Sequence, residues 1–349
     1  MNGGDGGNGN HRRNEVLFAA AAVAAAVATS LASSPSLVRQ SRLLMGTLCE
    51  VQVYHDDQAA ALAAATAALD AMERVDELLS NYKPGSELSA MNREAAREPF
   101  HASTELFDFV NRCANYHRAT EGAFDPTVGP LVRVWGFLTT HPARPSDAAI
   151  ANAKAQSGFE KVTIDASART IAYRTGGVEI DPGGIGKGYA VDQAVDVLRR
   201  RGIRSALVSA GGSTMFAIGS PPGRPAWNLA VKNPNDPAKP FSFVSVRDAS
   251  LSTSGVSERA VQAGGHRYAH VFDPRTGEPV EHMCQVTIVA PTGTASDALT
   301  KAAFVLPRET VRRLFQGEPD VHALRVEGDC GVENVLWATP WSSGVFVRE

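Results

Sequence analysis

Apolar residues recur at helical spacing in two long stretches of the chain. The first runs from Gln58 to Leu79, and the second from Thr104 to Ala119 with Thr104 as its expected N-cap. Steps of three and four residues place these side chains on one face, which is typical of an amphipathic helix. They are Leu62, Leu69, Met72, Val75 and Leu79 in the first stretch, and Leu106, Phe109, Val110 and Cys113 in the second.

Short apolar runs with strand character dominate the rest of the chain. Most of them follow one another without a helix between them, although helices are predicted from about Lys187 and over Ser296–Leu306. This order favours an α+β fold over a doubly wound parallel one: a single interwoven domain of mixed or antiparallel sheets with flanking helices. The predicted strands are Leu48–Tyr54, Val162–Ile164, Thr170–Tyr173, Val178–Ile180, Ala206–Ser209, Met215–Ile218, Trp227–Val231, Phe243–Val246, Tyr268–Phe272 and Gln285–Ala290.

Three further segments show neither the helical spacing of apolar residues nor the character of a strand. Ser80–Asn92 is predicted to be a loop, because Lys83-Pro84-Gly85 interrupts it. Gly122–Phe137 mixes prolines and glycines with large apolar residues, which indicates a packed irregular segment with a short helical piece. Pro142–Gln156 is polar and alanine-rich and is expected to be a surface excursion.

The first 40 residues differ from the rest in composition. A Gly/Asn-rich start, expected to be disordered, is followed by Arg12-Arg13, an apolar run over Val16–Ala28, and a small-residue ending at Ala32. That order is typical of an export signal. An uncleaved membrane anchor and an alanine-rich disordered extension remain the alternatives. We therefore divide the chain into an N-terminal segment, 1–40, and one folded domain, 41–349.

Composition narrows the function classes. The chain has 349 residues and a net charge of -3, which gives no support for a broad nucleic-acid surface. Its cysteines, Cys49, Cys113, Cys284 and Cys330, are far apart and form no CxxC pair, which argues against a zinc site. In an oxidising compartment they can pair, but the sequence does not choose among the connectivities.

A glycine-rich stretch, Ile180–Leu198, joins the tail of an apolar strand to an amphipathic helix. Glycines let backbone approach a ligand closely, and the N–H groups at a helix start beside Lys187 suit an anion. The stretch fits neither GxxxxGK[ST], because Asp181 and Gly188 stand at its first and last positions, nor GxGxxG. A tight turn without a ligand explains this stretch equally well.

Histidine and aspartate offer candidate chemistry nearer the C-terminus. His266 and His270 are four residues apart on a predicted strand, roughly 13 Å, which is too far to share one ion. His270 precedes a polar turn that begins at Asp273, where it could act as a general base or could simply be held by the turn.

Asp297 is predicted to open a helix in the stretch ASDALTKAAF. It either stabilises the helix N-terminus or ligates a hard cation such as magnesium, with Thr300 and Lys301 on the same side. Asp125 in GAFDP and Tyr82 in SNYKP are further polar residues in apolar or glycine-rich surroundings. Taken singly, each of these two is more typical of a turn or packing residue than of a ligand contact.

Together and in this order, the stretches resemble the ApbE-type FAD:protein FMN transferase family. The resemblance runs from about Arg42 to Phe315. The matching stretches are MGTLCEVQVY, SNYKPGSELSAMN, GAFDPTVGPLVRVWGF, IDPGGIGKGYAVD, ALVSAGGST, LSTSG, HRYAHVFDPRTGEPV and SDALTKAAFVL.

The resemblance implies a magnesium-dependent reaction with FAD as substrate. FMN would pass through its phosphate to a threonine or serine hydroxyl of a target redox protein, such as a flavin-bearing subunit of an electron-transport complex, and AMP would leave. Family members are exported to the periplasm or the outer side of the cytoplasmic membrane, which agrees with the N-terminal segment. Two alternatives stay open: an FAD pyrophosphatase giving FMN and AMP, and an exported flavin-binding protein without catalysis.

The resemblance also assigns residues by motif. His270 matches the proposed base, Asp297 matches the metal-binding aspartate, and Gly184 matches a metal position that its backbone carbonyl could fill. The positions implied to contact FAD are Met45, Tyr82, Ala123, Phe124, Asp125, Asp181, Lys187 and Phe272.

One position departs from the family pattern. Many members have a threonine four residues after the metal aspartate, where this chain has Lys301, and Thr300 lies one residue earlier. A protonated lysine cannot ligate magnesium. Either Thr300 takes over as ligand, the ion keeps more water, or Lys301 partly substitutes for a cation.

Overall fold

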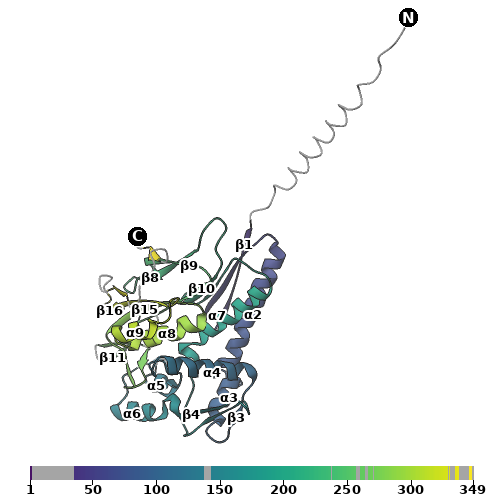
Figure 1. The fold of residues 1–349 in the computed structure, drawn as a ribbon. Coiled ribbons are helices and arrows are strands. Elements are labelled where there is room, and N and C mark those ends of the chain that lie inside the picture. The colour runs from purple at the N-terminus through teal and green to yellow at the C-terminus, as the bar shows by residue number, and fades with distance from the viewer. Residues whose placement is uncertain are drawn as a thin grey trace.

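The protein is described by a computed structural model over residue 1 and residues 35–136, 143–236, 238–256, 260–263, 266–269, 271–328, 330, 335–337 and 346–347. Its largest sheet has eight strands, and each neighbouring pair is antiparallel (Figure 1). In sheet order the strands are β1 (Ser36–Leu44), β2 (Thr47–His55), β6 (Ala206–Ala210), β7 (Thr214–Ile218), β10 (Ala249–Gly255), β15 (Met283–Ala290), β16 (His322–Glu327) and β17 (Val335–Trp337).

The two faces of this sheet are covered differently. Alternate residues of a strand point to opposite faces, and Val208 and Ile288 accordingly pack in the main core whereas their neighbours Leu207 and Val289 pack in a second cluster. The main core lies under three helices, α2 (Gln58–Leu79), α7 (Gly186–Arg200) and α8 (Gly293–Val305) (Figure 1). The second cluster lies under the paired strands β8 (Trp227–Lys232) and β9 (Pro240–Val246), and β9 also pairs with β18 (Phe346–Val347).

The smaller elements complete the fold. One group gathers in the lower half of Figure 1 around the sheet β3-β5-β4, and hairpins join β11 to β12 and β13 to β14. The remaining helices are α3 (Glu87–Glu94), α4 (Thr104–Ala119), α5 (Gly129–Val134), α6 (Asp147–Gln156) and α9 (Arg308–Phe315), with the 3-10 turns η1 (Phe159–Lys161) and η2 (Pro182–Gly184). The remaining strands are β3 (Phe100–His101), β4 (Val162–Asp165), β5 (Thr170–Tyr173), β11 (Ala260–Ala263), β12 (His266–Ala269), β13 (Phe272–Asp273) and β14 (Glu278–Pro279).

The α+β prediction is confirmed, and so are the two long helices. Helix α2 has the predicted bounds, although Leu62 in its apolar series is 45 % exposed because it faces away from the sheet. Helix α4 also has the predicted bounds, but its N-cap is Ser103, whose Oγ accepts from the Leu106 N–H at 3.2 Å. Strand β1 begins at Ser36 and so crosses the boundary placed after residue 40.

Two segments predicted without helices contain them. Helix α3 occupies the end of Ser80–Asn92, because Ser86 caps it and Leu88 and Met91 are buried on one face. Helix α6 fills most of the predicted excursion over 142–156 and buries Ile150 against α5. The short helical piece predicted within 122–137 is α5.

Two of the predicted strands are also wrong. Val178 and Ile180 are buried, but they pair with none of the described strands, and the Asn92 side chain instead bonds both the N–H and the carbonyl of Ile180. Tyr268–Phe272 is not one strand: β12 ends at Ala269, and β13 begins at Phe272 in a different hairpin.

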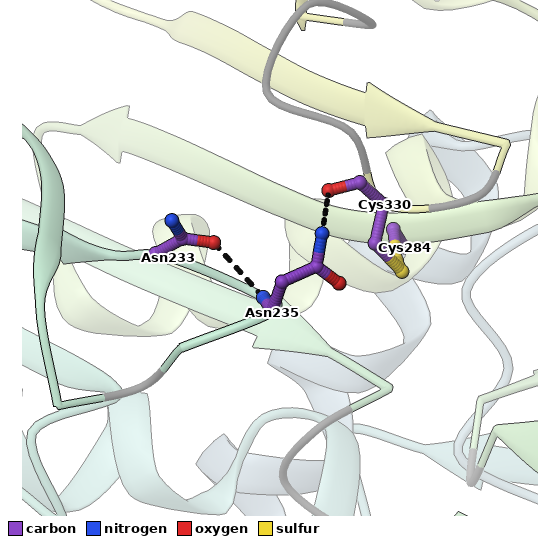
Figure 2. Close-up of a disulfide and its surroundings, with 4 residues drawn as sticks. All are labelled: Asn233, Asn235, Cys284 and Cys330. Atoms are coloured by element: carbon purple, nitrogen blue, oxygen red, sulfur yellow. Dashed lines mark hydrogen bonds between the residues drawn. A yellow bond between two sulfur atoms is a disulfide. The ribbon is translucent and has the colours of Figure 1, made fainter.

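A disulfide joins Cys284 on β15 to Cys330, which follows β16 (Figure 2). The Cα atoms are 5.3 Å apart, a normal separation for such a bond. The Asn235 side chain donates a hydrogen bond to the backbone carbonyl of Cys330 at 2.8 Å. Cys49 and Cys113 are free and buried, and burial raises the pKa of both thiols. No helix in the described part of the chain combines the length and apolar character needed to cross a bilayer.

Candidate active site

The N-terminal ends of α7 and α8 cross at two glycines. A Cβ on Gly188 would lie 2.1 Å from the Gly293 carbonyl oxygen, and a Cβ on Gly293 would lie 2.6 Å from the Gly188 carbonyl oxygen. Both distances are far below van der Waals contact, so this crossing requires glycine on each helix. Gly188, which the sequence suggested could approach a ligand, therefore approaches another helix.

Each helix caps the other with an aspartate. On α7, the Asp192 carboxylate accepts from the Gly293 N–H at 2.6 Å and the Thr294 N–H at 2.9 Å, both in the first turn of α8. On α8, Asp297 Oδ2 accepts from the Gly188 N–H at 3.0 Å in the first turn of α7. These N–H groups have no partner within their own helices. Burial raises the pKa of Asp192, although its hydrogen bonds oppose that shift.

Asp297 does not open its own helix, as the sequence had suggested. Helix α8 begins four residues earlier at Gly293, and its N-cap is Thr292, whose side chain accepts from the Ala295 N–H. Asp297 is 1 % exposed, and its second oxygen, Oδ1, accepts from Lys301 Nζ at 2.6 Å. The carboxylate thus bridges the α7 backbone and a lysine ammonium.

The Lys301 ammonium is held in an oxygen cage. Beyond Asp297 Oδ1, it lies 3.2 Å from the Asp297 carbonyl oxygen and 3.0 Å from Thr300 Oγ1. The Thr300 hydroxyl also contacts the Asp297 carbonyl at 2.7 Å and Ser254 Oγ on β10 at 2.8 Å. A lysine ammonium has three N–H donors, and three oxygens surround this one.

Magnesium does not fit beside Asp297 while this ammonium is in place. A carboxylate, a carbonyl and a hydroxyl are the oxygen types that hard cations take, but Lys301 already contacts all of them. The described residues contain no group of three or more His, Cys, Asp or Glu side chains able to hold a metal ion.

The glycine-rich turn η2 closes one side of this cage. A Cβ on Gly184 would lie 3.4 Å from Lys301 Cγ and 3.3 Å from the Phe124 ring. The Asp181 N–H, just before η2, donates to the Pro126 carbonyl at 2.7 Å. The motifs GAFDP, IDPGG and SDALTK, distant in sequence, therefore meet here.

Comparison with known proteins identifies the family of the chain. A family model described as the ApbE family matches residues 45–325. The chain belongs to the ApbE family. It is 33 % identical to the FAD:protein FMN transferase of Treponema pallidum over 306 residues, which cover 83 % of this chain and 84 % of that protein. It is 31 % identical to the Escherichia coli K12 protein of the same name over 281 residues, covering 78 % and 79 %.

Solved ApbE structures share the fold. The ApbE protein of Thermotoga maritima superposes with a TM-score of 0.77 at 29 % identity, covering 84 % of this chain and 94 % of that one. The flavin transferase ApbE from Vibrio cholerae gives a TM-score of 0.73 at 26 % identity, covering 90 % and 96 %.

Lys187, a predicted FAD contact in this ApbE-family chain, lies in the first turn of α7. Its ammonium bonds to the Ser213 hydroxyl, in the SAGGST loop between β6 and β7. Lys187 and Lys301 therefore extend from the two helices whose ends cross. The chain places two cations around one helix junction, which suits a substrate with two phosphates.

Asp125 has a fully satisfied carboxylate. Oδ1 accepts from the Thr127 N–H at 2.8 Å and the Thr127 hydroxyl at 2.6 Å, and Oδ2 accepts from the Phe159 N–H at 3.1 Å. His117 Nδ1 lies 3.6 Å from Oδ2. Burial raises the pKa of this carboxyl. These contacts hold the GAFDP turn, and contact with FAD stays a prediction of the ApbE resemblance.

The other predicted FAD contacts have varied settings. Met45 lies in the turn between β1 and β2 with a φ of 53°, and Tyr82 is 68 % exposed in the loop before α3. Ala123 is buried beside Phe124 in the main core, whereas Phe272 packs in another cluster with its ring 6.2 Å from that of Trp135. Asp181 is the N-cap of η2 and accepts from the Gly183 N–H at 2.6 Å.

The base predicted for the reaction, His270, lies outside the described residues, so its role stays a prediction of the family motif. Val271, the next residue, is buried and accepts a backbone hydrogen bond from Val280 at 2.9 Å.

A cavity of about 720 Å³ opens beside Val178 and Glu179, shortly before Asp181. Its described lining does not include the predicted FAD contacts, but it adjoins them through Asn81 and Glu179. Asn92 and Asn81 in its wall both donate to the Ile180 carbonyl. The cavity is thus a neighbour of the predicted site, and we assign it no ligand.

Three site residues were not singled out from the sequence: Asp192, Ser213 and Ser254. Buried serines at alternate positions of β10, namely Ser250, Ser252 and Ser254, face α8 and bond to Ser296 or Thr300. Alternating serines on a strand were the signal in the sequence that could have pointed to Ser254, because buried hydroxyls need hydrogen-bond partners.

Proposed function

We propose that this chain transfers FMN from FAD to a threonine or serine hydroxyl of a target redox protein. The observation that carries the proposal is the junction of α7, α8 and η2. There, Gly184 from one ApbE motif lies against Lys301, which pairs with Asp297 from another, although more than a hundred residues of the chain separate the two motifs. The relatives named FAD:protein FMN transferase support the same reaction.

The proposed step breaks the phosphoanhydride bond of FAD and forms a phosphoester bond to the acceptor. The acceptor hydroxyl oxygen attacks the FMN-side phosphorus of FAD, and the bond from that phosphorus to the bridging oxygen breaks. AMP leaves with the bridging oxygen and its electron pair, while the hydroxyl proton passes to a base. His270 holds the family's base position, and histidine suits proton transfer near neutral pH.

Positive groups of the chain would offset the charge that develops on the leaving phosphate. Lys187 and Lys301 lie on the two crossing helices and carry fixed positive charge. Preorganised donors of this kind are a major source of transition-state stabilisation. We assign no step to magnesium, since Lys301 takes the place beside Asp297.

We also propose that the chain works outside the cytoplasm. The basic and apolar N-terminal segment supports export. The bond between Cys284 and Cys330 supports an oxidising compartment, because such bonds are rare in the cytosol. Periplasmic or membrane-anchored flavoprotein subunits with an exposed threonine or serine would be the partners.

The test is an intact-mass measurement on a partner that a characterised ApbE transferase modifies. The full chain is incubated with FAD and this partner, and a partner with the acceptor threonine changed to valine serves as control. We expect the partner to gain the mass of one FMN, with AMP released in equal amount and no gain in the control. AMP without a mass gain would show FAD hydrolysis instead, and neither product would refute the proposed activity.

A further inference from the structure

The oxygen cage beside Asp297 already contains a cation. The Asp297 carboxylate, the Asp297 carbonyl and the Thr300 hydroxyl converge on Lys301 Nζ at 2.6, 3.2 and 3.0 Å. The lysine side chain is only 15 % exposed, and its Cγ lies against Gly184. The ammonium therefore occupies the interior of the site rather than its rim.

We propose that Lys301 is the resident cation of this site, so that the chain binds no divalent metal beside Asp297. Charge supports this assignment. The Asp297 carboxylate and the Lys301 ammonium form a buried pair with no net charge. A divalent ion added there would meet one carboxylate already paired and an ammonium of the same sign, which costs free energy in a poorly solvated place.

The remaining Asp297 oxygen offers no second position. Oδ2 accepts the Gly188 N–H at 3.0 Å, and that N–H has no other partner within its helix. Moving Asp297 to coordinate an ion would leave a buried donor unsatisfied. Thr300 Oγ1 is similarly committed to the Asp297 carbonyl and to Ser254.

The ammonium also has a donor to give to substrate. Its longest contact, 3.2 Å, is to the Asp297 carbonyl oxygen. That oxygen also accepts a hydrogen bond from the Thr300 hydroxyl at 2.7 Å. One Lys301 N–H can therefore turn to a phosphate oxygen without leaving that carbonyl unpaired. In this respect the lysine offers phosphate an N–H donor at the place where the resemblance puts magnesium.

The first test measures metal binding and needs no activity. The full-length chain is titrated with Mn²⁺ and followed by electron paramagnetic resonance, which reports free ion. We expect no saturable site in the unmodified chain. Lys301→Thr removes the ammonium and restores the family's residue, so it should gain a saturable Mn²⁺ site. Adding Asp297→Asn to that variant should abolish the site, and Lys239→Thr, at an exposed lysine, should not create one.

The second test rests on the proposed function and measures AMP release with MgCl₂ or with EDTA. The unmodified chain should release AMP at the same rate in both. In EDTA, Lys301→Thr should be slower by roughly 10²- to 10³-fold, the cost of losing one preorganised donor, and MgCl₂ should restore its rate. Lys301→Met, which keeps the length but not the charge, should be slow in both.

These results separate the two proposals. A saturable, Asp297-dependent Mn²⁺ site in the unmodified chain would overturn the inference, as would full activity of Lys301→Thr in EDTA. If no variant releases AMP or transfers FMN under any condition, the proposed function fails while the Mn²⁺ titration still decides the inference. A thermal melt of each variant confirms that it is folded.

Discussion

Asp297 serves two helices with one carboxylate. Its two oxygens accept from the Gly188 N–H on α7 and the Lys301 ammonium on α8. The sequence offered helix capping and cation binding as alternatives, but the structure combines capping of a different helix with binding of an ammonium. Both partners are buried or nearly so, which makes this residue costly to replace.

Replacing Asp297 with asparagine should therefore affect both stability and activity. The amide cannot accept with both ends, and it leaves the Lys301 ammonium without its counter-charge. We expect the free energy of unfolding to fall by about 3 kcal/mol, as when one partner of a buried pair is removed, and FMN transfer to fall with it.

Urea unfolding and product mass would measure both effects. The control is Asp196→Asn on the exposed face of α7, which should change stability by no more than about 0.5 kcal/mol. Equal stability of the two variants would contradict the bridging role of Asp297.

At the scale of elements, α7 and α8 form one mutually capped unit. Asp192 on α7 satisfies the start of α8, and Asp297 on α8 satisfies the start of α7. The glycine crossing brings the two helix ends close enough for both exchanges. Lys187, Asp297 and Lys301 are thus positioned by helices rather than by loops, which favours fixed geometry.

Gly188→Ala tests this unit. The added Cβ would meet the Gly293 carbonyl and also lie 2.8 Å from Asp297 Cβ, so the helix ends must separate. We expect a loss of about 1–3 kcal/mol, typical of overpacking, together with slower FMN transfer. Thermal unfolding and product mass would report these changes.

The control for that variant is Gly317→Ala, where the new Cβ has no neighbour within 4 Å. Substitution there should leave both the melting temperature and the transfer rate near those of the unmodified chain. If Gly188→Ala behaved like this control, the two helix ends would not be as tightly packed as described.

Elements were predictable wherever a periodic pattern lay within one segment. Helix α2 was predicted to the residue because its apolar positions recur over many turns, whereas the shorter α3 was hidden by Lys83-Pro84-Gly85 just before it. Val178–Ile180 has the composition of a strand, yet the backbone of Ile180 is satisfied by asparagine side chains that no local pattern reveals.

The site was predictable only in its parts. Motif resemblance named Asp297, Gly184 and Lys301, but the contact between Asp297 and Gly188 joins residues 109 positions apart. Such a contact depends on how the sheet and helices assemble. The cage around Lys301 likewise needed the observed geometry, since the sequence left three alternatives for that position.

At the scale of the molecule, one covalent bond ties the C-terminal segment to the main sheet. Cys330 lies after the strand β16 and bonds to Cys284 on the adjacent strand β15, where Asn235 from the β8–β9 connection also reaches it (Figure 2). Three separate parts of the chain meet there. The bond closes a loop with a sequence separation of 46 residues, which restricts the unfolded chain.

Reduction of this bond should lower stability without unfolding the protein outright. We expect a loss of about 2–4 kcal/mol, the usual contribution of a native disulfide, measured as a lower melting temperature in reductant. Cys330→Ser should melt at the lower temperature with or without reductant. An unmodified chain insensitive to reductant, or a variant that still responds to it, would contradict this prediction.

The glycine crossing also constrains how this family member can evolve. Each of Gly188 and Gly293 is held by the other's backbone, so an alanine at either position forces the same separation of α7 and α8. The second alanine should then cost less than the first, and the two penalties should not add. The first replacement of a glycine should therefore be selected against, whereas a lineage that had already lost one glycine would lose the other at little further cost.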